Sequence, residues 1–383
     1  FLYWYPVDLR VSAKELVPNH LTFFIFHHVA LFSQKHWPKA IGVNGMLMIE
    51  GKQMHKSKGN FVTMKNAIEE YGADATRSAL VLSAEGMDDP DWRSENVRDM
   101  RNKLESFYNF AKNIIKNAES GENGHLEKWL MSALQHRISA VTENFEEMKT
   151  RTSLEIALFE IWNDFRWYIH RKGEAKTKIL KEALKIWLKL LAPFAPHICE
   201  ELWSEMKEEH FISLAEWPQA KEELINEQAE EKENLINEII EDTLNILKAT
   251  KVTPQKICYY TASPWKWRVY LRVLEKSKHG EVKLNEIMKE FAAEDDLKEK
   301  LKEVAKFAAK VVQEMGKISE KRKADLLKIG TLKEKKVIEE AKDFLAERFK
   351  ARIIVYSEDE KERYDPRLRA MLSMPCRPAI YIE

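Results

Sequence analysis

Strand-like stretches and one amphipathic helical stretch alternate over the first sixty residues of the chain. Residues 7–11 and 41–49 are strand candidates, and residues 19–34 between them carry apolar positions at helical spacing. A strand, a helix and a second strand in this order predict a parallel pair joined by a right-handed crossover. Ligands of such sheets bind at the carboxyl ends of the strands, so the residues after position 49 are the first candidates for a site.

The pattern becomes helical after residue 60. Thr63 is placed to cap a helix that ends at Gly72, and Asp74 to cap the next helix, which continues through residues 77–82. From Ser94 to about residue 249, apolar positions recur every three or four residues in a series of long segments. This spacing predicts an antiparallel helix bundle.

The character of the chain changes again after Lys251. Residues 256–261, 352–356 and 379–382 are strand-like, and charged helical stretches separate them. Few strands with helices between them predict a small α/β domain at the end of the chain.

Composition narrows the class of protein. A chain of 383 residues is too long for one ordinary core and predicts two or three domains. Lys plus Arg equals Asp plus Glu, 62 against 62, so a nucleic-acid partner would have to bind local patches. No stretch approaches the roughly 20 apolar residues of a membrane span, so no membrane partner is expected. The three cysteines lie far apart, which favours neither a zinc site nor a disulfide framework and is typical of the cytoplasm.

A basic, glycine-bounded segment, Met-His-Lys-Ser-Lys-Gly-Asn, occupies residues 54–60, directly after the apolar run 46–49. Lysine ammonium groups and a backbone made pliable by glycine suit the binding of phosphates. A turn of this composition that is merely solvated is the alternative. The segment therefore makes a nucleotide or a nucleic acid the first ligand to consider.

Three segments of the chain resemble segments of a known protein family, and they occur in the same order as in that family. Residues 51–60 resemble the KMSKS signature of class I aminoacyl-tRNA synthetases, and residues 68–77 and 191–203 resemble two segments of the subgroup that handles branched aliphatic amino acids. The opening, with residues 4–12, and the ending, residues 378–383, are similar to leucyl-tRNA synthetases of the archaeal and eukaryotic cytosolic type. The resemblance covers nearly the whole chain.

The resemblance implies a fold class: an α/β partial Rossmann catalytic half, then an all-α helix bundle, then a small α/β C-terminal domain. The implied domains are the second half of the Rossmann domain with its KMSKS-like loop (1–62), a stem-contact connector (63–93), an anticodon-binding-type bundle (94–250) and a C-terminal α/β tRNA-binding domain (251–383). The family's H-x-G-H element and its editing insertion are absent from these residues. We therefore expect the leucine pocket and half of the ATP site to lie on a missing N-terminal catalytic half.

The implied function is ATP-dependent activation of leucine and its transfer to tRNA-Leu. This chain would supply the KMSKS loop and the tRNA-binding domains, and it would be inactive alone. Two alternatives remain open: a noncatalytic tRNA-binding module or subunit, and a sister synthetase for isoleucine or valine. The implied partners are the missing half and tRNA-Leu, contacted at its anticodon stem and its long variable arm.

Activation displaces pyrophosphate from ATP in line, so the protein must neutralise charge on the leaving phosphates. The resemblance assigns this catalytic role to Lys56. Gln53 and His55 depart from the signature, which has Lys and Ser there, while Met54 would pack the loop and Ser57 would donate to phosphate oxygens. Mg²⁺ would arrive with ATP, and no protein-bound metal is expected. Glu15 occupies the place where the family's strand-end carboxylate approaches the ATP ribose, and a glutamate that merely begins a helix is the alternative. The implied ATP-binding set is Gln53, Met54, His55, Lys56, Ser57 and Glu15.

Acidic and basic clusters complete the candidates. The acidic residues of segment 88–92 are expected to cap and solvate a turn, and His197 with Glu200 to pack within a bundle helix. Basic clusters are either solvated surfaces or contacts to an RNA backbone. The tRNA-binding candidates are Arg171, Lys172, Lys176, Lys321, Arg322, Lys323, Arg367 and Arg369.

Overall fold

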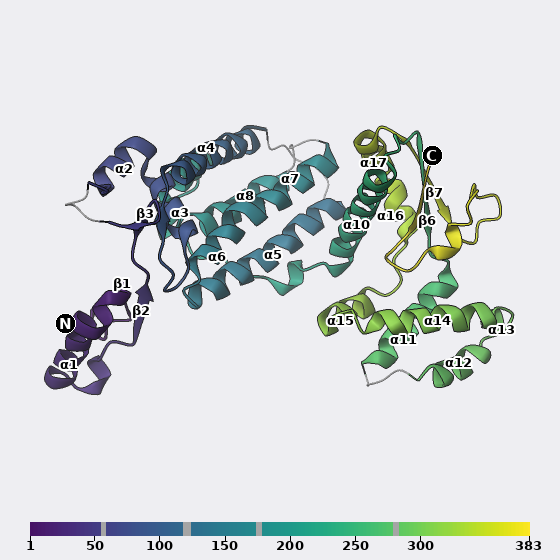
Figure 1. Cartoon of the computed structure of the whole chain (residues 1–383), viewed down its shortest axis with the longest axis horizontal. Helices are drawn as coiled ribbons and strands as arrows, with labels where there is room; N and C mark the ends of the chain where they lie inside the picture. Colours follow the sequence, from purple (N-terminus) through teal and green to yellow (C-terminus); the bar gives the residue numbers. More distant parts are fainter. Residues whose placement is uncertain (55–58, 118–123, 174–177, 279–282) are drawn as a thin grey trace. The chain divides into compact units, whose positions relative to one another are not determined.

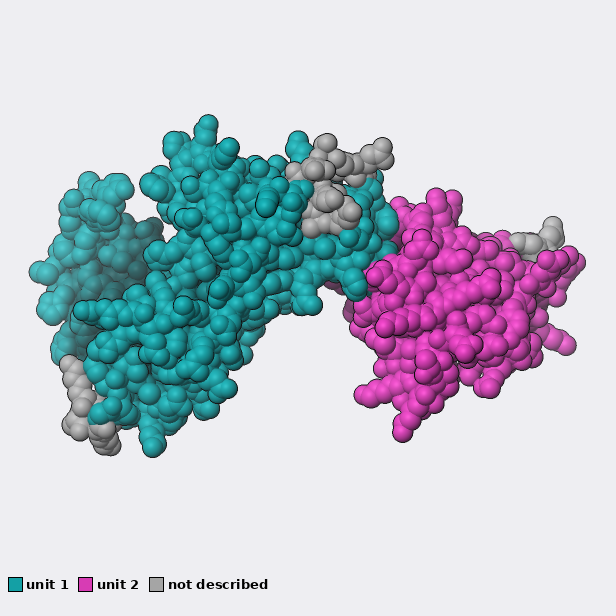
Figure 2. Space-filling model, turned by 90° about the horizontal axis from the view of Figure 1, so that it is seen from above, with its two compact units in different colours: residues 1–225 teal, residues 226–383 magenta. Residues whose placement is uncertain are grey.

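The computed structural model describes residues 1–54, 59–117, 124–173, 178–278 and 283–383. The chain forms two compact units, residues 1–225 and residues 226–383, which Figure 2 shows in teal and magenta. Both are mainly helical with small sheets (Figure 1).

The first unit opens with the predicted strand, helix and strand. Strands β1 (Leu9–Ala13) and β2 (Ala40–Asn44) pair in parallel, with Leu9 opposite Ala40. The connection holds η1 (Lys14–Leu16), η2 (Val17–Leu21), α1 (Thr22–Leu31) and η3 (Gln34–His36). The parallel pairing is confirmed, although the bounds differ by a few residues.

The predicted strand over residues 41–49 is divided in two. β2 ends at Asn44, and the chain forms β3 (Met48–Ile49) in a different sheet. Gly45 lies between them against the backbone of Asp88, where an added Cβ would lie 2.0 Å from the carbonyl oxygen. Glycine therefore allows a close approach of two backbones at the point where the apolar run changes sheets.

The second sheet carries the signature segment. β3 pairs antiparallel with β4 (Lys52–Gln53) and parallel with β5 (Asp91–Trp92). Between β4 and β5 lie α2 (Met64–Tyr71) and α3 (Ala73–Ser83). Thr63 caps α2 as predicted, because its side chain accepts a hydrogen bond from the backbone N–H of Asn66.

Long helices follow and bury a shared apolar core. α5 packs against both α7 and α8, while α4 packs against α8 and α9. Aromatic side chains fill the interior, and Phe107, Phe165, Tyr168 and Trp187 are fully buried. The elements are α4 (Ser94–Asn117), α5 (His125–Glu146), α6 (Thr150–Leu154), η5 (Glu155–Glu160), α7 (Ile161–Lys172), α8 (Lys178–Leu191), α9 (Pro196–Glu205), η6 (Ile212–Leu214) and η7 (Glu222–Leu224).

The second unit is built around a three-stranded sheet in the order β7–β6–β8. β6 pairs in parallel with β7 and antiparallel with β8, at the three places where the sequence predicts strands. Its elements are α10 (Glu227–Thr250), β6 (Lys256–Thr261), α11 (Pro264–Ser277), α12 (Leu284–Ala292), α13 (Asp295–Lys298), α14 (Leu301–Met315), α15 (Glu320–Ile329), α16 (Glu334–Glu340), α17 (Lys342–Phe349), β7 (Arg352–Ser357), η8 (Ala370–Leu372) and β8 (Ala379–Ile382).

Helix α10 packs in the second unit, whereas the sequence pattern places it at the end of the bundle. It contacts α15 and α16, and the hydroxyl groups of Thr243 and Tyr259 lie 2.9 Å apart. The division between the compact units falls between Ile225 and Asn226, and the predicted domain boundary near residue 250 stays a prediction. A helix has the same apolar spacing whichever core it covers, so its pattern alone does not identify its partner.

Among the described residues, none of the helices is both long enough and apolar enough to cross a bilayer. The same residues contain no group of three or more His, Cys, Asp or Glu side chains arranged to hold a metal ion. All three cysteines are buried as free thiols.

Candidate functional site

The stem of the signature segment is a short hairpin fastened on both sides. Glu50 and Gly51 turn the chain between β3 and β4 with φ angles of 49° and 73°, in the left-handed region that glycine adopts readily. The N–H of Gly51 donates to Oδ1 of Asp91 over 2.9 Å, and Nδ2 of Asn60 donates to the carbonyl oxygen of Gln53 over 2.7 Å. The chain on each side of residues 55–58 is thus held in place.

Only part of the predicted ATP-binding set lies in the described residues. Gln53 is exposed and Met54 is half-buried at the end of the hairpin stem. His55, Lys56 and Ser57 lie outside the described residues, so their predicted roles stay predictions.

The acidic segment connects the two sheets. Oδ1 of Asp89 accepts the backbone N–H of Met46 over 2.7 Å and pairs with Nζ of Lys14 at 2.6 Å. The Lys14 contact, and after it the Met46 N–H, lowers the pKa of Asp89. The N–H of Gly51, and after it Arg93, lowers the pKa of Asp91. These carboxylates therefore hold separate segments together, a role beyond the expected solvated turn.

Glu15 is exposed in η1, directly after the carboxyl end of β1. Its neighbour Lys14 also donates from Nζ to the carbonyl oxygen of Met87 over 3.3 Å. Residues 87–91 thereby link the end of β1 to the signature hairpin. The structure therefore joins the segments that carry the ATP-site candidates into one network, and the roles of these candidates in binding ATP stay predictions.

Two of the family-like segments contact each other through Asp74. Its carboxylate accepts the backbone N–H groups of His197, over 3.2 Å, and Ile198, over 2.7 Å, in the first turn of α9. It is buried and does not cap its own helix, where Gly72 occupies the cap position, so that prediction is wrong. The capped helix lies 123 residues away, which no local pattern reveals.

The side chain of His197 is 74% exposed, and its Nδ1 lies 2.8 Å from Oδ1 of Asp74. The expectation that His197 packs in the bundle core is therefore wrong. Glu200 accepts the backbone N–H of Ile212, so the two residues serve different partners. Two further hydrogen bonds join α3 to the segment before α9. Nε of Arg77 donates to the carbonyl oxygen of Pro193, and Oγ of Ser78 donates to that of Phe194.

Two of the basic tRNA-binding candidates in the first unit already make contacts within the protein. Nζ of Lys172 lies 2.9 Å from the buried carboxylate of Glu127, which also accepts the hydroxyl of Tyr168 over 2.6 Å. Arg171 is half-buried and has contacts of its own. Lys176 lies outside the described residues. Lys172 therefore anchors α7 to α5, whatever further contact it makes.

In the second unit, two of the three basic residues on α15 have structural partners. Arg322 pairs through both terminal nitrogens with the buried carboxylate of Glu231 on α10. Lys323 is buried and donates to Glu320 over 2.7 Å. Lys321 is exposed. Among these three, Lys321 is thus the most accessible to a polyanion.

Arg367 and Arg369 are exposed on a loop that is firmly anchored. The buried ammonium of Lys266 donates to the carbonyl oxygens of Met371, over 2.9 Å, and Ser373, over 2.8 Å. Sequence reasoning missed Lys266, because a lysine within a helix of mixed polarity gives no sign that it is buried. The anchored loop presents its arginines on a rigid support.

Family models and a solved structure match parts of this chain. Residues 127–259 match the family model for the anticodon-binding domain of tRNA ligase, and residues 3–118 match that for class I (M) tRNA synthetases. A crystal structure of the LeuRS–tRNA–LeuAMS ternary complex from Agrobacterium radiobacter K84 superposes with a TM-score of 0.51 at 19% identity, covering 68% of this chain and 31% of that one. At this identity the likeness concerns the fold alone.

Curated relatives match the chain along its entire length. The leucine–tRNA ligase of Methanococcoides burtonii is 42% identical and that of Pyrococcus abyssi 40% identical, in each case over 100% of this chain. The chain spans only 40% and 38%, respectively, of the length of those relatives. The chain therefore belongs to the leucine–tRNA ligase family along its whole length, and it spans about two fifths of the length of these relatives.

Proposed function

We propose that this chain is the part of a leucine–tRNA ligase that supplies the signature loop and the tRNA-binding surfaces. The whole enzyme would form leucyl-adenylate from leucine and ATP and then transfer leucine to tRNA-Leu. The observation that carries the proposal is the match to leucine–tRNA ligases over the entire chain. The fastened hairpin beneath residues 55–58 adds physical support, because catalysis by positioning requires a rigid base for the loop.

In this proposal, Lys56 neutralises charge that develops on the phosphates as pyrophosphate leaves, and the loop amides and Ser57 donate to phosphate oxygens. Glu15, at the carboxyl end of β1, accepts hydrogen bonds from the ribose hydroxyls. Mg²⁺ enters as the complex with ATP and is part of the substrate. Positioning and charge neutralisation are thus the chemistry assigned to this chain.

Besides tRNA, the proposed partner is the remaining part of the ligase, which would cover the first residues of this chain. Helix α1 is apolar around most of its circumference, yet Phe23, Phe26 and Leu31 are 62%, 65% and 71% exposed. A helix of this kind is normally buried, and parallel sheets are normally covered on both faces. About three fifths of the length of the relatives lies outside this chain and is available to cover these surfaces.

The test combines this chain with the complementary portion of a related leucine–tRNA ligase. We expect ATP–pyrophosphate exchange that depends on leucine, and charging of tRNA-Leu, only when both portions are present. Exchange driven by isoleucine or valine would identify a sister synthetase instead. Tight tRNA binding by this chain without any exchange in the combined sample would identify a noncatalytic module.

We also propose that the long variable arm of tRNA-Leu contacts residues 251–383, where Arg367 and Arg369 lie exposed on their anchored loop. Binding of tRNA-Leu, of the same tRNA without its arm, and of tRNA-Ile is compared over a series of salt concentrations. Tighter binding of the intact tRNA-Leu is expected. Equal affinity with and without the arm would overturn this assignment.

A further inference from the structure

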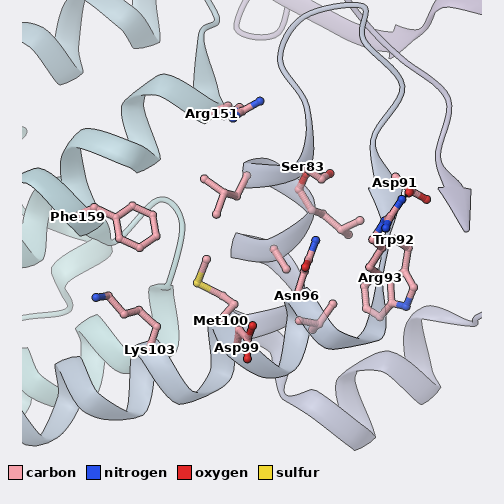
Figure 3. Close-up of a pocket in the computed structure, with 14 residues that line it drawn as sticks. Ser83, Asp91, Trp92, Arg93, Asn96, Asp99, Met100, Lys103, Arg151 and Phe159 are labelled. Carbon is pink, nitrogen blue, oxygen red and sulfur yellow. Dashed lines mark hydrogen bonds and ion pairs between the residues drawn. The ribbon is translucent and has the colours of Figure 1, made fainter. Parts of the chain in front are cut away.

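A cavity of about 690 Å³ lies in the first unit, between α3, β5, α4 and α6. Figure 3 shows Lys103 and Phe159 on one side of it and Asp91 and Arg93 on the other. Arg151 also lines it. Lys103 on α4, Arg93 directly before that helix and Arg151 on α6 therefore line one hollow of the surface, together with the carboxylates of Asp91 and Asp99.

Two of these cations are paired with carboxylates, and the third is not. Arg93 pairs with Asp91 at 2.8 Å, and Arg151 pairs with Glu155 at 3.0 Å. Lys103 instead lies over aromatic rings, with Nζ 4.2 Å from the ring centroid of Trp162 and 5.4 Å from that of Phe159. Where the structure describes the chain, Lys103 has no carboxylate within ion-pair distance. Its charge is left for an external anion to balance.

A second cation without a carboxylate partner in the described residues, Arg166 on α7, acts on Lys103. Burial, and after it the charge of Arg166, lowers the pKa of Lys103. Arg166 follows Trp162 by one helical turn on α7, so it lies on the face of that helix that carries the ring under Lys103. An anion bound between the two cations would offset their repulsion. The arrangement is therefore suited to an anion.

The shape of the surface favours a polymeric anion over a small one. Arg166 lines a neighbouring cavity of about 580 Å³ together with Phe110 and Trp167. Along α4, the distance from Asn96 in the first cavity to Phe110 in the second corresponds to about 21 Å of helix. Cations interleaved with aromatic side chains over such a length are typical of nucleic-acid surfaces.

We propose that Lys103 and Arg166 bind a phosphate group of the tRNA backbone, and that the RNA strand follows α4 along the two cavities. This inference rests on the proposed function, in which the chain binds tRNA. It adds a contact surface on the face formed by α4 and α7, and none of its residues belongs to the basic clusters found in the sequence. Sequence inspection missed it because the two cations are single residues on separate helices.

The test measures tRNA-Leu binding by the full chain over a salt series for wild type, Lys103→Ala/Arg166→Ala and a matched control, Lys189→Ala/Lys128→Ala. Lys189 also lies over an aromatic ring, that of Trp203, and Lys128 is an exposed residue of α5. Both double variants lose two positive charges, so their comparison separates position from net charge. Thermal unfolding of each variant checks that the fold is intact.

We expect the Lys103/Arg166 variant to bind about 10-fold more weakly, with the slope of log affinity against log salt reduced by about 1, because one phosphate contact is lost, while the control changes less than about 2-fold. The loss should be equal for tRNA-Leu and tRNA-Ile, because a phosphate contact carries no base specificity. If both double variants lost affinity equally, or if neither lost affinity, this inference would be overturned while the proposed function would stand. Absence of tRNA binding by the wild type would overturn the proposed function as well.

Discussion

At the scale of single residues, the charged side chains that hold this fold together are those with partners far away in the sequence. Asp74, Asp91 and Lys266 each join segments that are 40 or more residues apart. Their neighbours in sequence give no indication of these partners. The resemblance to a known family identified the signature segment, yet it could not reveal which carboxylates hold its stem.

Lys56 is the residue on which the proposed chemistry depends most. In the combined two-portion ligase, Lys56→Ala should lower the rate of leucine-dependent ATP–pyrophosphate exchange by about 10²-fold to 10³-fold, because a transition-state charge contact is lost. The matched control is Lys52→Ala, which removes an exposed lysine on the hairpin and should change the rate only a few-fold. A rate unchanged in Lys56→Ala would remove Lys56 from the mechanism.

Glu334 is expected to make the stability of the second unit depend on pH. Burial raises the pKa of this carboxyl group to about 7, even though it accepts the backbone N–H groups of Cys376 and Ala262. Because the folded pKa is above the unfolded one, its contribution is fully present below about pH 4.5 and is lost as the pH rises through about 7. The shift corresponds to roughly 3 kcal/mol of unfolding free energy between those limits.

The measurement is urea unfolding of wild type and Glu334→Gln at pH 5 and pH 8. An amide does not titrate, so the stability of the second unit should change less with pH in the variant than in the wild type. Parallel pH profiles for the two proteins would exclude Glu334 as the source of the pH dependence.

At the scale of elements, sequence patterns predicted those strands and helix caps that depend on neighbouring residues. The parallel strands of the opening, the three strands of the second unit and the Thr63 cap are confirmed because alternation, apolar runs and capping depend on neighbouring residues. The division of the run 41–49 between two sheets was not predictable, since it depends on the backbone of Asp88 approaching Gly45.

Asp74 provides a test of one such long-range contact between elements. Asp74→Ala leaves two N–H groups of the first turn of α9 without their acceptor, and should lower the unfolding free energy of the first unit by about 1–3 kcal/mol. Urea unfolding followed by circular dichroism measures the change. His197→Ala is the control, because it removes the exposed ring and keeps the backbone bonds, and it should have a smaller effect. Equal effects would mean that the ring contact dominates.

At the scale of the whole molecule, the division between Ile225 and Asn226 places α10 with the C-terminal sheet. The helix contributes buried side chains, including Leu235, Ile236 and Ile239, and the buried carboxylate that pairs with Arg322. Residues 226–383 alone should therefore unfold cooperatively, whereas residues 251–383 should not fold stably. Thermal unfolding of the two segments makes the comparison, and equal cooperativity would place the boundary near residue 250.

The contacts at Asp74 and at Asp91 stand at opposite ends of one covalent segment, which runs from α3 through residues 84–90 to β5. One end holds the start of α9, and the other holds the turn beneath the signature residues. Linkage is reciprocal. If the hairpin binds a nucleotide as proposed, a ligand of the bundle that favours one position of this segment would change the nucleotide affinity by some factor, and the nucleotide would change the affinity of that ligand by the same factor. Measuring tRNA affinity with and without ATP therefore determines the same free energy as measuring ATP affinity with and without tRNA.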